Sequence, residues 1–152
     1  MDGGDRPPSP GPAFTLLRQR FGPDDAPRLR QLVSRCAHAA GLTGRRLEDF
    51  VLAVHELVTN AVRHGGGSGL LRLHRVGDTL RCEVNDHGPG MSADDVAVDD
   101  PPPANQPGGR GLWIAGLLAD RLEISPTARG LSVTVSVRVT DEKARADPEV
   151  TP

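Results

Sequence analysis

The sequence has few aromatic side chains. Phe, Trp and Tyr make up 3% of its 152 residues, with one Trp and no Tyr, while hydrophobic residues of all kinds make up 37%. Any core must therefore be built mainly from Leu, Val, Ala and Ile. A typical domain has about 100 to 150 residues, so the chain is long enough for one core and too short for two ordinary domains.

The sequence also has no excess of positive charge and no long hydrophobic run. Its formal net charge is -2, whereas proteins that bind a phosphate backbone usually have an excess of Lys and Arg. This balance argues against nucleic acid as a direct partner. No hydrophobic run reaches the roughly 20 residues that span a bilayer, and the first residues do not resemble a signal peptide. We expect a cytoplasmic protein without a membrane segment.

Cysteine is scarce, and the pattern of a zinc protease is incomplete. Cys36 and Cys82 match neither a CxxC pair nor a zinc spacing, so we predict that both are reduced and buried. His55 and Glu56 begin the helical zinc-protease motif, but position 59 is Thr rather than the second His. This sequence excludes a zinc pair on that helix face.

Proline, glycine and charged residues dominate both ends of the chain. Residues 1–12 and 141–152 contain too little apolar material to offset the entropy that ordering them would cost. We predict two disordered tails around one domain, residues 13–140.

Hydrophobic spacing predicts the elements of this domain. A period of 3.6 residues predicts three helices: residues 24–40, a second helix that ends at about His64, and residues 111–119. Asp24 is the expected cap of the first helix, and Thr43 is the expected cap of the second. Alternation predicts strands over 13–21, 70–76, 80–86 and 131–139, with the second and third joined as a hairpin and with 121–125 before the last.

A long loop separates the third strand from the third helix. Residues 89–109 contain three successive prolines, an acidic cluster and several glycines, which exclude a continuous helix or a central strand. Long loops inside compact domains are often lids or binding loops. We expect residues 92–108 to act as a lid that becomes protected when a ligand binds.

The second predicted helix carries Glu56 and Asn60, which are four residues apart and therefore one turn apart on the same face. A neutral Asn oxygen can complete the oxygen shell of Mg²⁺, and a nearby Glu can orient or deprotonate an attacking water or hydroxyl. Taken alone, the pair is weak evidence, because a solvated helix face often carries Glu and Asn at this spacing.

Asp86 ends the third predicted strand and is followed by Gly88 and Gly90. An Asp at a strand terminus can accept a hydrogen bond from the amine of adenine, and the glycines let the backbone approach a flat base. The alternative is a glycine-rich turn that only closes the strand.

The third motif, Gly108-Gly109-Arg110-Gly111-Leu112, leads from the long loop into the third helix. Free amides at a helix start, together with the helix dipole, can bind phosphate. The alternative is a turn that only starts the helix and binds no ligand.

Taken together, the three motifs in this order resemble the nucleotide-binding motifs of the GHKL superfamily, which includes gyrases, heat-shock chaperones, histidine kinases and mismatch-repair proteins. The phrase from Glu56 to Gly65, followed by Gly109 to Leu112, is most similar to stand-alone anti-sigma-factor serine/threonine kinases of actinobacterial type. The resemblance covers roughly residues 14–138. It implies an α+β fold, a two-layer α/β sandwich with helices on one face of a mostly antiparallel mixed sheet, and an ATP lid.

The resemblance also implies cofactors and site residues. ATP and Mg²⁺ would be the cofactors, with Glu56 as the catalytic base and Asn60 as the metal ligand. Asp86 would read the adenine. The remaining nucleotide-binding candidates are Arg63, His64, Gly88, Gly90, Met91, Gly109, Arg110, Gly111, Leu112 and Ser132. Arg63 and His64 could instead offset the negative end of the helix dipole, and Ser132 stands where many relatives have a Thr.

The function implied by the resemblance is that of a kinase that phosphorylates an anti-sigma antagonist and also sequesters a sigma factor. The resemblance suggests a homodimer as well. Two alternatives remain open. One is a nucleotide-gated binding module without kinase activity, and the other is an ATPase or histidine-kinase-like catalytic domain. The presence of both Glu56 and Asn60 favours an enzyme, because a pure binder does not need the base.

Overall fold

The computed structural model describes residues 13–64, 66–86, 109–128 and 130–139. Eight elements follow along the chain: β1 (Ala13–Phe21), α1 (Ala26–Ala39), α2 (Gly44–His64), β2 (Gly69–Val76), β3 (Thr79–Asp86), α3 (Gly109–Leu118), β4 (Arg121–Pro126) and β5 (Leu131–Arg138). Each predicted helix and strand is present, with bounds that shift by one or two residues. The expected tails and the loop before α3 lie outside the described residues and stay predictions.

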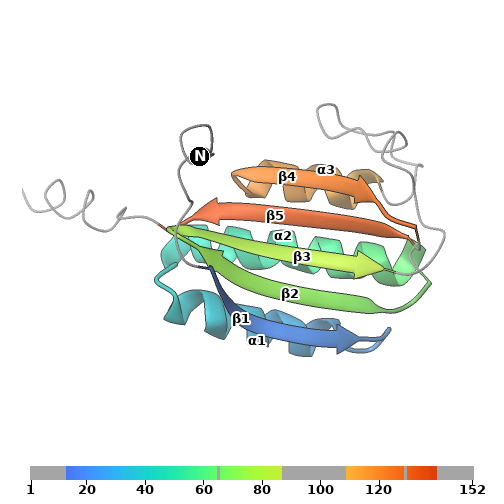
Figure 1. Ribbon diagram of the computed structural model, residues 1–152, viewed down its shortest axis with the longest axis horizontal. Coiled ribbons are helices and arrows are strands. Elements are labelled where there is room, and N and C mark those ends of the chain that lie inside the picture. The colour runs from blue at the N-terminus through green and yellow to red at the C-terminus, as the bar shows by residue number, and fades with distance from the viewer. Residues whose placement is uncertain (1–12, 65, 87–108, 129, 140–152) are drawn as a thin grey trace, which may run out of the picture.

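The five strands form one sheet in the order β1-β2-β3-β5-β4 (Figure 1). Each of the four neighbouring pairs is antiparallel, so these strands do not form the mixed sheet that we expected. β3 and β4 run in the same direction, and β5 lies between them. The chain therefore leaves β3, passes through α3, and returns two positions away to form the edge of the sheet.

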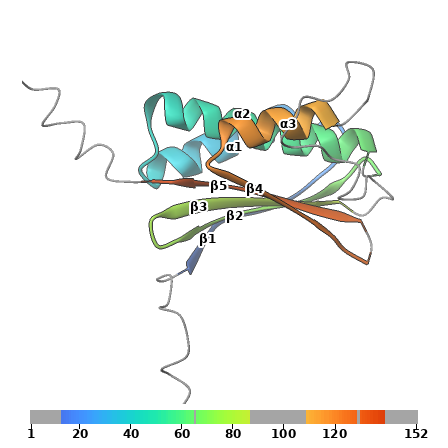
Figure 2. The same ribbon diagram turned by 90° about the horizontal axis from the view of Figure 1, so that it is seen from above.

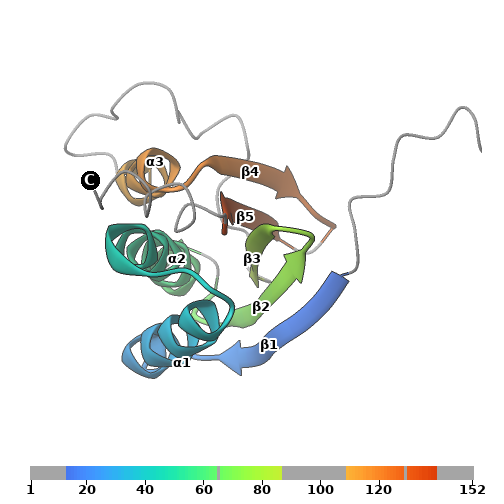
Figure 3. The same ribbon diagram turned by 90° about the vertical axis from the view of Figure 1, so that its left-hand side faces the viewer.

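All three helices cover the same face of the sheet, which confirms the predicted two-layer α+β fold. Figure 2 shows the helices on one side of the strands, and Figure 3 shows α2 between α1 and α3. The other face of the sheet carries none of the described helices. None of the described helices is long and apolar enough to cross a membrane.

The core lies between α2 and the sheet. On α2, the residues at helical spacing that are buried against the sheet include Phe50, Ala53, Leu57 and Val58. The strands contribute alternating Leu and Val side chains, and burial of each large apolar side chain contributes about 1.5 to 3 kcal/mol. Cys82 is free and buried, as predicted.

Two local expectations were wrong. Cys36 is free, as predicted, but only partly buried. Asp24 does not cap α1, because the helix begins at Ala26 and Asp25 occupies the cap position without a side-chain capping bond. The carboxylate of Asp25 instead accepts a hydrogen bond from the backbone of Gly22 at 2.7 Å. A proline in the first helical turn favours a helix start at this point.

Candidate functional site

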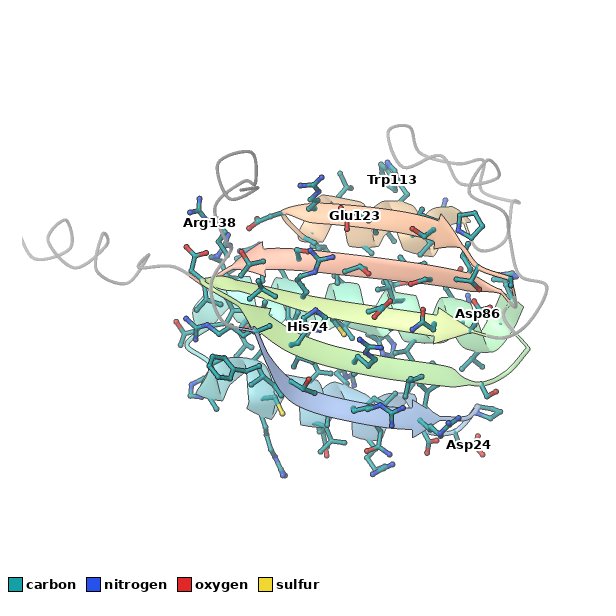
Figure 4. All side chains as sticks on the ribbon, in the orientation of Figure 1. Asp24, His74, Asp86, Trp113, Glu123 and Arg138 are labelled. Carbon is teal, nitrogen blue, oxygen red and sulfur yellow. The ribbon has the colours of Figure 1, made fainter. Side chains whose placement is uncertain are left out.

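Four element ends meet at one end of the sheet. β3 ends there at Asp86 and β5 begins there, and the last turns of α2 lie above them (Figure 1). The start of α3 joins this group through its close approach to α2. Figure 4 labels Asp86 at this end. The topology therefore gathers residues from all three predicted motifs.

Asp86 is buried, with 6% of its surface exposed. Its Oδ1 accepts a hydrogen bond from the backbone N–H of Leu131 at 3.3 Å. The residue before Leu131 is Gly130, and a Cβ there would lie 2.6 Å from the same oxygen and closer still to the Asp86 carbonyl. Only glycine fits at this position, so the start of β5 lies directly against the carboxylate.

An aromatic ring lies two strands away from Asp86, on β1. Gly69 is the register partner of both Asp86 and Phe21. A Cβ on Gly69 would lie 2.7 Å from Cζ of Phe21, so the buried Phe21 ring packs directly over this glycine. We did not identify Phe21, Gly69 or Gly130 from the sequence, although a glycine inside a strand often indicates such a close approach.

On α2, Asn60 is 7% exposed, and its Oδ1 atom is buried without a hydrogen-bond partner among the described residues. Leaving a buried acceptor unsatisfied costs about 1 to 3 kcal/mol. An oxygen in this state fits a site that a donor or a metal ion completes.

Glu56 lies one turn before Asn60 and is half-buried. Its carboxylate faces the beginning of α3, because a Cβ on Gly111 would lie 3.0 Å from Glu56 Oε1. The absence of a side chain at Gly111 thus lets the positive end of the α3 dipole come close to the carboxylate.

The motif at the start of α3 divides between surface and core. Gly109 is the first residue of the helix, and Arg110 is exposed. Leu112 is fully buried in the core. Its side chain anchors the helix start, so any ligand contact from Leu112 would have to come from its backbone.

The last two residues of α2 differ in burial. Arg63 is exposed, whereas Nε2 of His64 is buried and has no hydrogen-bond partner in the described part of the chain. Both residues lie at the negative end of the helix dipole. Dipole compensation and nucleotide contact both stay predictions for these two residues.

The structure does not bring Ser132 to this group. Ser132 faces away from the helices, and its hydroxyl donates a hydrogen bond to Glu83 Oε2 at 3.0 Å. Asp86 shares the opposite, helix-facing side of the sheet with Val84. Strand residues alternate between faces, so the register of β5 separates the two side chains. Gly88, Gly90 and Met91 lie outside the described residues and stay predictions.

His55 precedes Glu56 and contributes to the local electrostatics. Burial lowers its pKa from 6.5, and the charge of Arg30 lowers it further, while Glu56 opposes the shift. The imidazole is therefore neutral at neutral pH and does not place a positive charge beside the Glu56 carboxylate.

The family model of the histidine kinase-like ATPase domain matches residues 21–149. This match covers most of the chain, so the chain belongs to the histidine kinase-like ATPase domain family. No curated protein sequence matches it significantly.

Solved structures share the fold. The RsbU and RsbW domains of Rv1364c from Mycobacterium tuberculosis match with a TM-score of 0.58 and 21% identity, over 80% of this chain and 32% of that chain. This chain thus spans about a third of that protein. The histidine kinase AdeS from Acinetobacter baumannii matches with a TM-score of 0.49 and 15% identity, over 84% and 70% of the two chains. At these identities the first likeness shows the fold alone.

Proposed function

We propose that this chain binds Mg-ATP and transfers the terminal phosphoryl group to a Ser or Thr hydroxyl of a partner protein. The observation that carries the proposal is the arrangement of Asn60 and Glu56. A buried amide oxygen that has no partner among the described residues lies one helical turn from a carboxylate that faces the start of α3. Membership of the histidine kinase-like ATPase domain family supports ATP as the ligand.

The donor set around Asn60 fits a magnesium ion that is shared with a nucleotide. Among the described residues, no group of three or more His, Cys, Asp and Glu side chains could hold a metal ion. Asn60 would therefore be the main protein ligand, and phosphate oxygens and water would complete the octahedral shell that Mg²⁺ prefers. When bound, the ion neutralises charge on the phosphates.

Asp86 would recognise the adenine. The Leu131 amide and Gly130 hold the carboxylate in a fixed position at the end of β3. A fixed, buried acceptor discriminates well between bases, because a ligand without the matching donor leaves it unpaired. By resemblance, Gly88, Gly90 and Met91 would shape the rest of the base pocket.

Glu56 would act as the general base toward the accepting hydroxyl. A general base must come within hydrogen-bond distance of the proton that it removes. The Glu56 side chain is half-buried and lies beside Gly111 at the start of α3. The amides of Gly109 and Gly111 would bind phosphate oxygens, and the exposed Arg110 would reach the terminal phosphate. Phosphoryl transfer depends mainly on such positioning and on charge stabilisation.

The proposed partners are an anti-sigma antagonist, as the phosphorylated substrate, and a sigma factor. Two features support this choice. The motif around Asn60 resembles that of anti-sigma-factor kinases, and a solved structure with the same fold contains an RsbW domain. The alternatives are a nucleotide-gated binding module without transfer, and an ATPase or histidine-kinase-like domain.

The test is phosphorylation of candidate antagonist proteins with labelled ATP, combined with two substitutions. Glu56→Gln should bind nucleotide nearly normally and should lower transfer by roughly 100-fold or more, because the base acts only in the transfer step. Asn60→Ala should weaken both nucleotide binding and transfer, because it removes the proposed metal ligand. Glu48→Gln, an exposed position two turns earlier on α2, is the matched control.

Three outcomes would contradict parts of the proposal. Unchanged transfer in Glu56→Gln would remove Glu56 as the base. ATP binding without transfer to any Ser or Thr would favour the binding module. Phosphate release without a phosphorylated protein would favour an ATPase.

A further inference from the structure

The helix-free face of the sheet is charged. Because strand residues alternate, the residues between the buried Leu and Val positions of each strand all point to this face. Figure 4 is viewed from this side, with His74 on β2 and Glu123 on β4 labelled. The β3-β5-β4 side and the β1-β2 side of this face differ in how many of their arginines have acidic partners.

On the β3-β5-β4 side, the chain supplies its own acidic partners. Arg81 and Arg121 both form ion pairs with Glu123, each at 3.3 Å. Arg138 forms an ion pair with Asp78 at 3.4 Å. Each of these three arginines therefore has an acidic partner within the fold.

On the β1-β2 side, three arginines gather without equal compensation. Arg18 on β1 lies directly opposite Arg72 on β2 in the strand register, and Arg20 is the next residue of β1 on the same face. We call Arg18, Arg20 and Arg72 the basic patch. Within the described residues, one ion pair involves the patch: Arg72 lies 3.7 Å from Glu83, which also accepts a hydrogen bond from the Ser132 hydroxyl.

The arrangement of the patch is unfavourable for the isolated fold. Like charges directly opposite each other destabilise a strand pair. The neighbouring His74 experiences the same positive field: burial lowers its pKa, and the charges of Arg81 and Arg72 lower it further. An anion lying along β1 and β2 would relieve this repulsion.

We propose that the basic patch is a docking surface for an acidic segment of a partner protein, whose carboxylates bind between Arg18 and Arg72. The planar guanidinium group binds carboxylates through two parallel hydrogen bonds, which gives arginine pairs both strength and geometry. The patch lies on the face of the sheet that is opposite the helices carrying Asn60 and Glu56. The proposal therefore does not depend on the proposed nucleotide site.

Charge and side-chain type favour a protein segment as the occupant over a single-stranded nucleic acid or a second copy of this chain. Single-stranded nucleic acids usually stack bases on aromatic rings. Both Phe residues of the described strands pair in register with residues on the helix-facing side of β2. Their rings therefore do not lie on the charged face, where they could stack on bases. A second copy that met this one patch against patch would bring the arginines of both copies together, which would add to the repulsion.

The test uses a fluorescein-labelled peptide of ten glutamates as the probe and fluorescence anisotropy as the readout. The full chain should bind this peptide, and the double variant Arg18→Ser/Arg72→Ser should bind it at least tenfold more weakly. The matched control is Arg35→Ser/Arg45→Ser, which removes the same charge from exposed helix positions. The control should change the affinity less than threefold, and an equal loss in both variants would overturn the proposal.

Three further measurements test the proposal: thermal stability, binding of a single-stranded nucleic acid, and sedimentation. The melting temperature of Arg18→Ser should be equal to that of the original chain or higher by about 2 °C, because a like-charge contact is lost. A clear drop in melting temperature would mean that Arg18 stabilises the fold, and it would overturn the proposal. Tighter binding of a ten-nucleotide single strand than of the peptide, or dissociation of a dimer by the double variant in sedimentation, would also overturn it.

Discussion

Asp86 combines a structural contact with a proposed ligand contact. Its Oδ1 holds the backbone of Leu131, and Gly130 lies so close that any side chain there would collide with the carboxylate. The residue is thus fixed from the β5 side before any ligand binds. Such preorganisation reduces the side-chain entropy that the protein would lose when a nucleotide binds.

Asp86→Asn should weaken binding of Mg-ATP at least tenfold. The amide can still accept the Leu131 N–H through its oxygen, but its nitrogen would then present a donor to the donor of adenine. An unpaired polar group in a buried site costs about 1 to 3 kcal/mol. Calorimetry measures the effect, with Asp78→Asn at the opposite end of the hairpin as control. Unchanged affinity would remove Asp86 from the base-reading role.

Two histidines should make stability depend on pH. The folded-state pKa values of His55 and His74 both lie below 6.5, chiefly because of burial. The unfolded chain therefore binds more protons than the folded chain as the pH falls through 6.5. The free energy of unfolding should decrease from pH 7.5 to 5.5.

Urea denaturation across this pH range measures the slope. The double variant His55→Gln/His74→Gln should show a flatter dependence, whereas His38→Gln, an exposed control, should keep the original slope. An unchanged slope in the double variant would contradict the prediction.

At the scale of elements, the contact between α2 and α3 depends on a missing side chain. Gly111 lets the start of α3 approach Glu56. Gly116 on the same helix has ordinary space around it, because a Cβ there would lie 4.0 Å from Leu122 Cβ. The two glycines therefore offer the same substitution in different surroundings.

Gly111→Ala should lower phosphoryl transfer while the protein stays folded. The added methyl group would lie 3.0 Å from Glu56 Oε1, and the flexible carboxylate can move away from it. Gly116→Ala should leave transfer unchanged and should raise stability by about 0.5 to 1 kcal/mol, because alanine favours a helix interior. Equal transfer rates in both variants would show that the Glu56 position is not set by Gly111.

Local pattern was enough to predict the elements and the β2-β3 hairpin, but not the rest of the strand order. The 3.6-residue spacing on α2 and the alternation in β2 and β3 are properties of short segments, and the structure confirms them. The position of β5 between β3 and β4 depends on contacts that are distant in sequence. The same is true of Ser132, whose face depends on strand register, and of the Arg18–Arg72 contact.

At the scale of the whole molecule, a single core joins the two layers. Phe50 on α2 is its largest fully buried side chain. It belongs to a buried cluster that is made mainly of Leu, Val and Ala side chains. Large-to-small changes at such positions combine lost burial with a cavity.

Phe50→Ala should reduce the free energy of unfolding by about 3 to 5 kcal/mol. This is a large share of the roughly 5 to 15 kcal/mol that stabilises a typical domain. Urea denaturation followed by circular dichroism measures the loss. Leu117→Ala is the control, because Leu117 is 64% exposed and should change stability by less than about 0.5 kcal/mol.

The place of β5 also affects how the protein is made. A ribosome delivers β3 and β4 before it delivers the strand that lies between them. Until residues 131–138 emerge, β3 and β4 each have an open edge, and unpaired edges can join other chains. Until β5 pairs with them, the edges of β3 and β4 that face the position of β5 are unpaired and prone to aggregation.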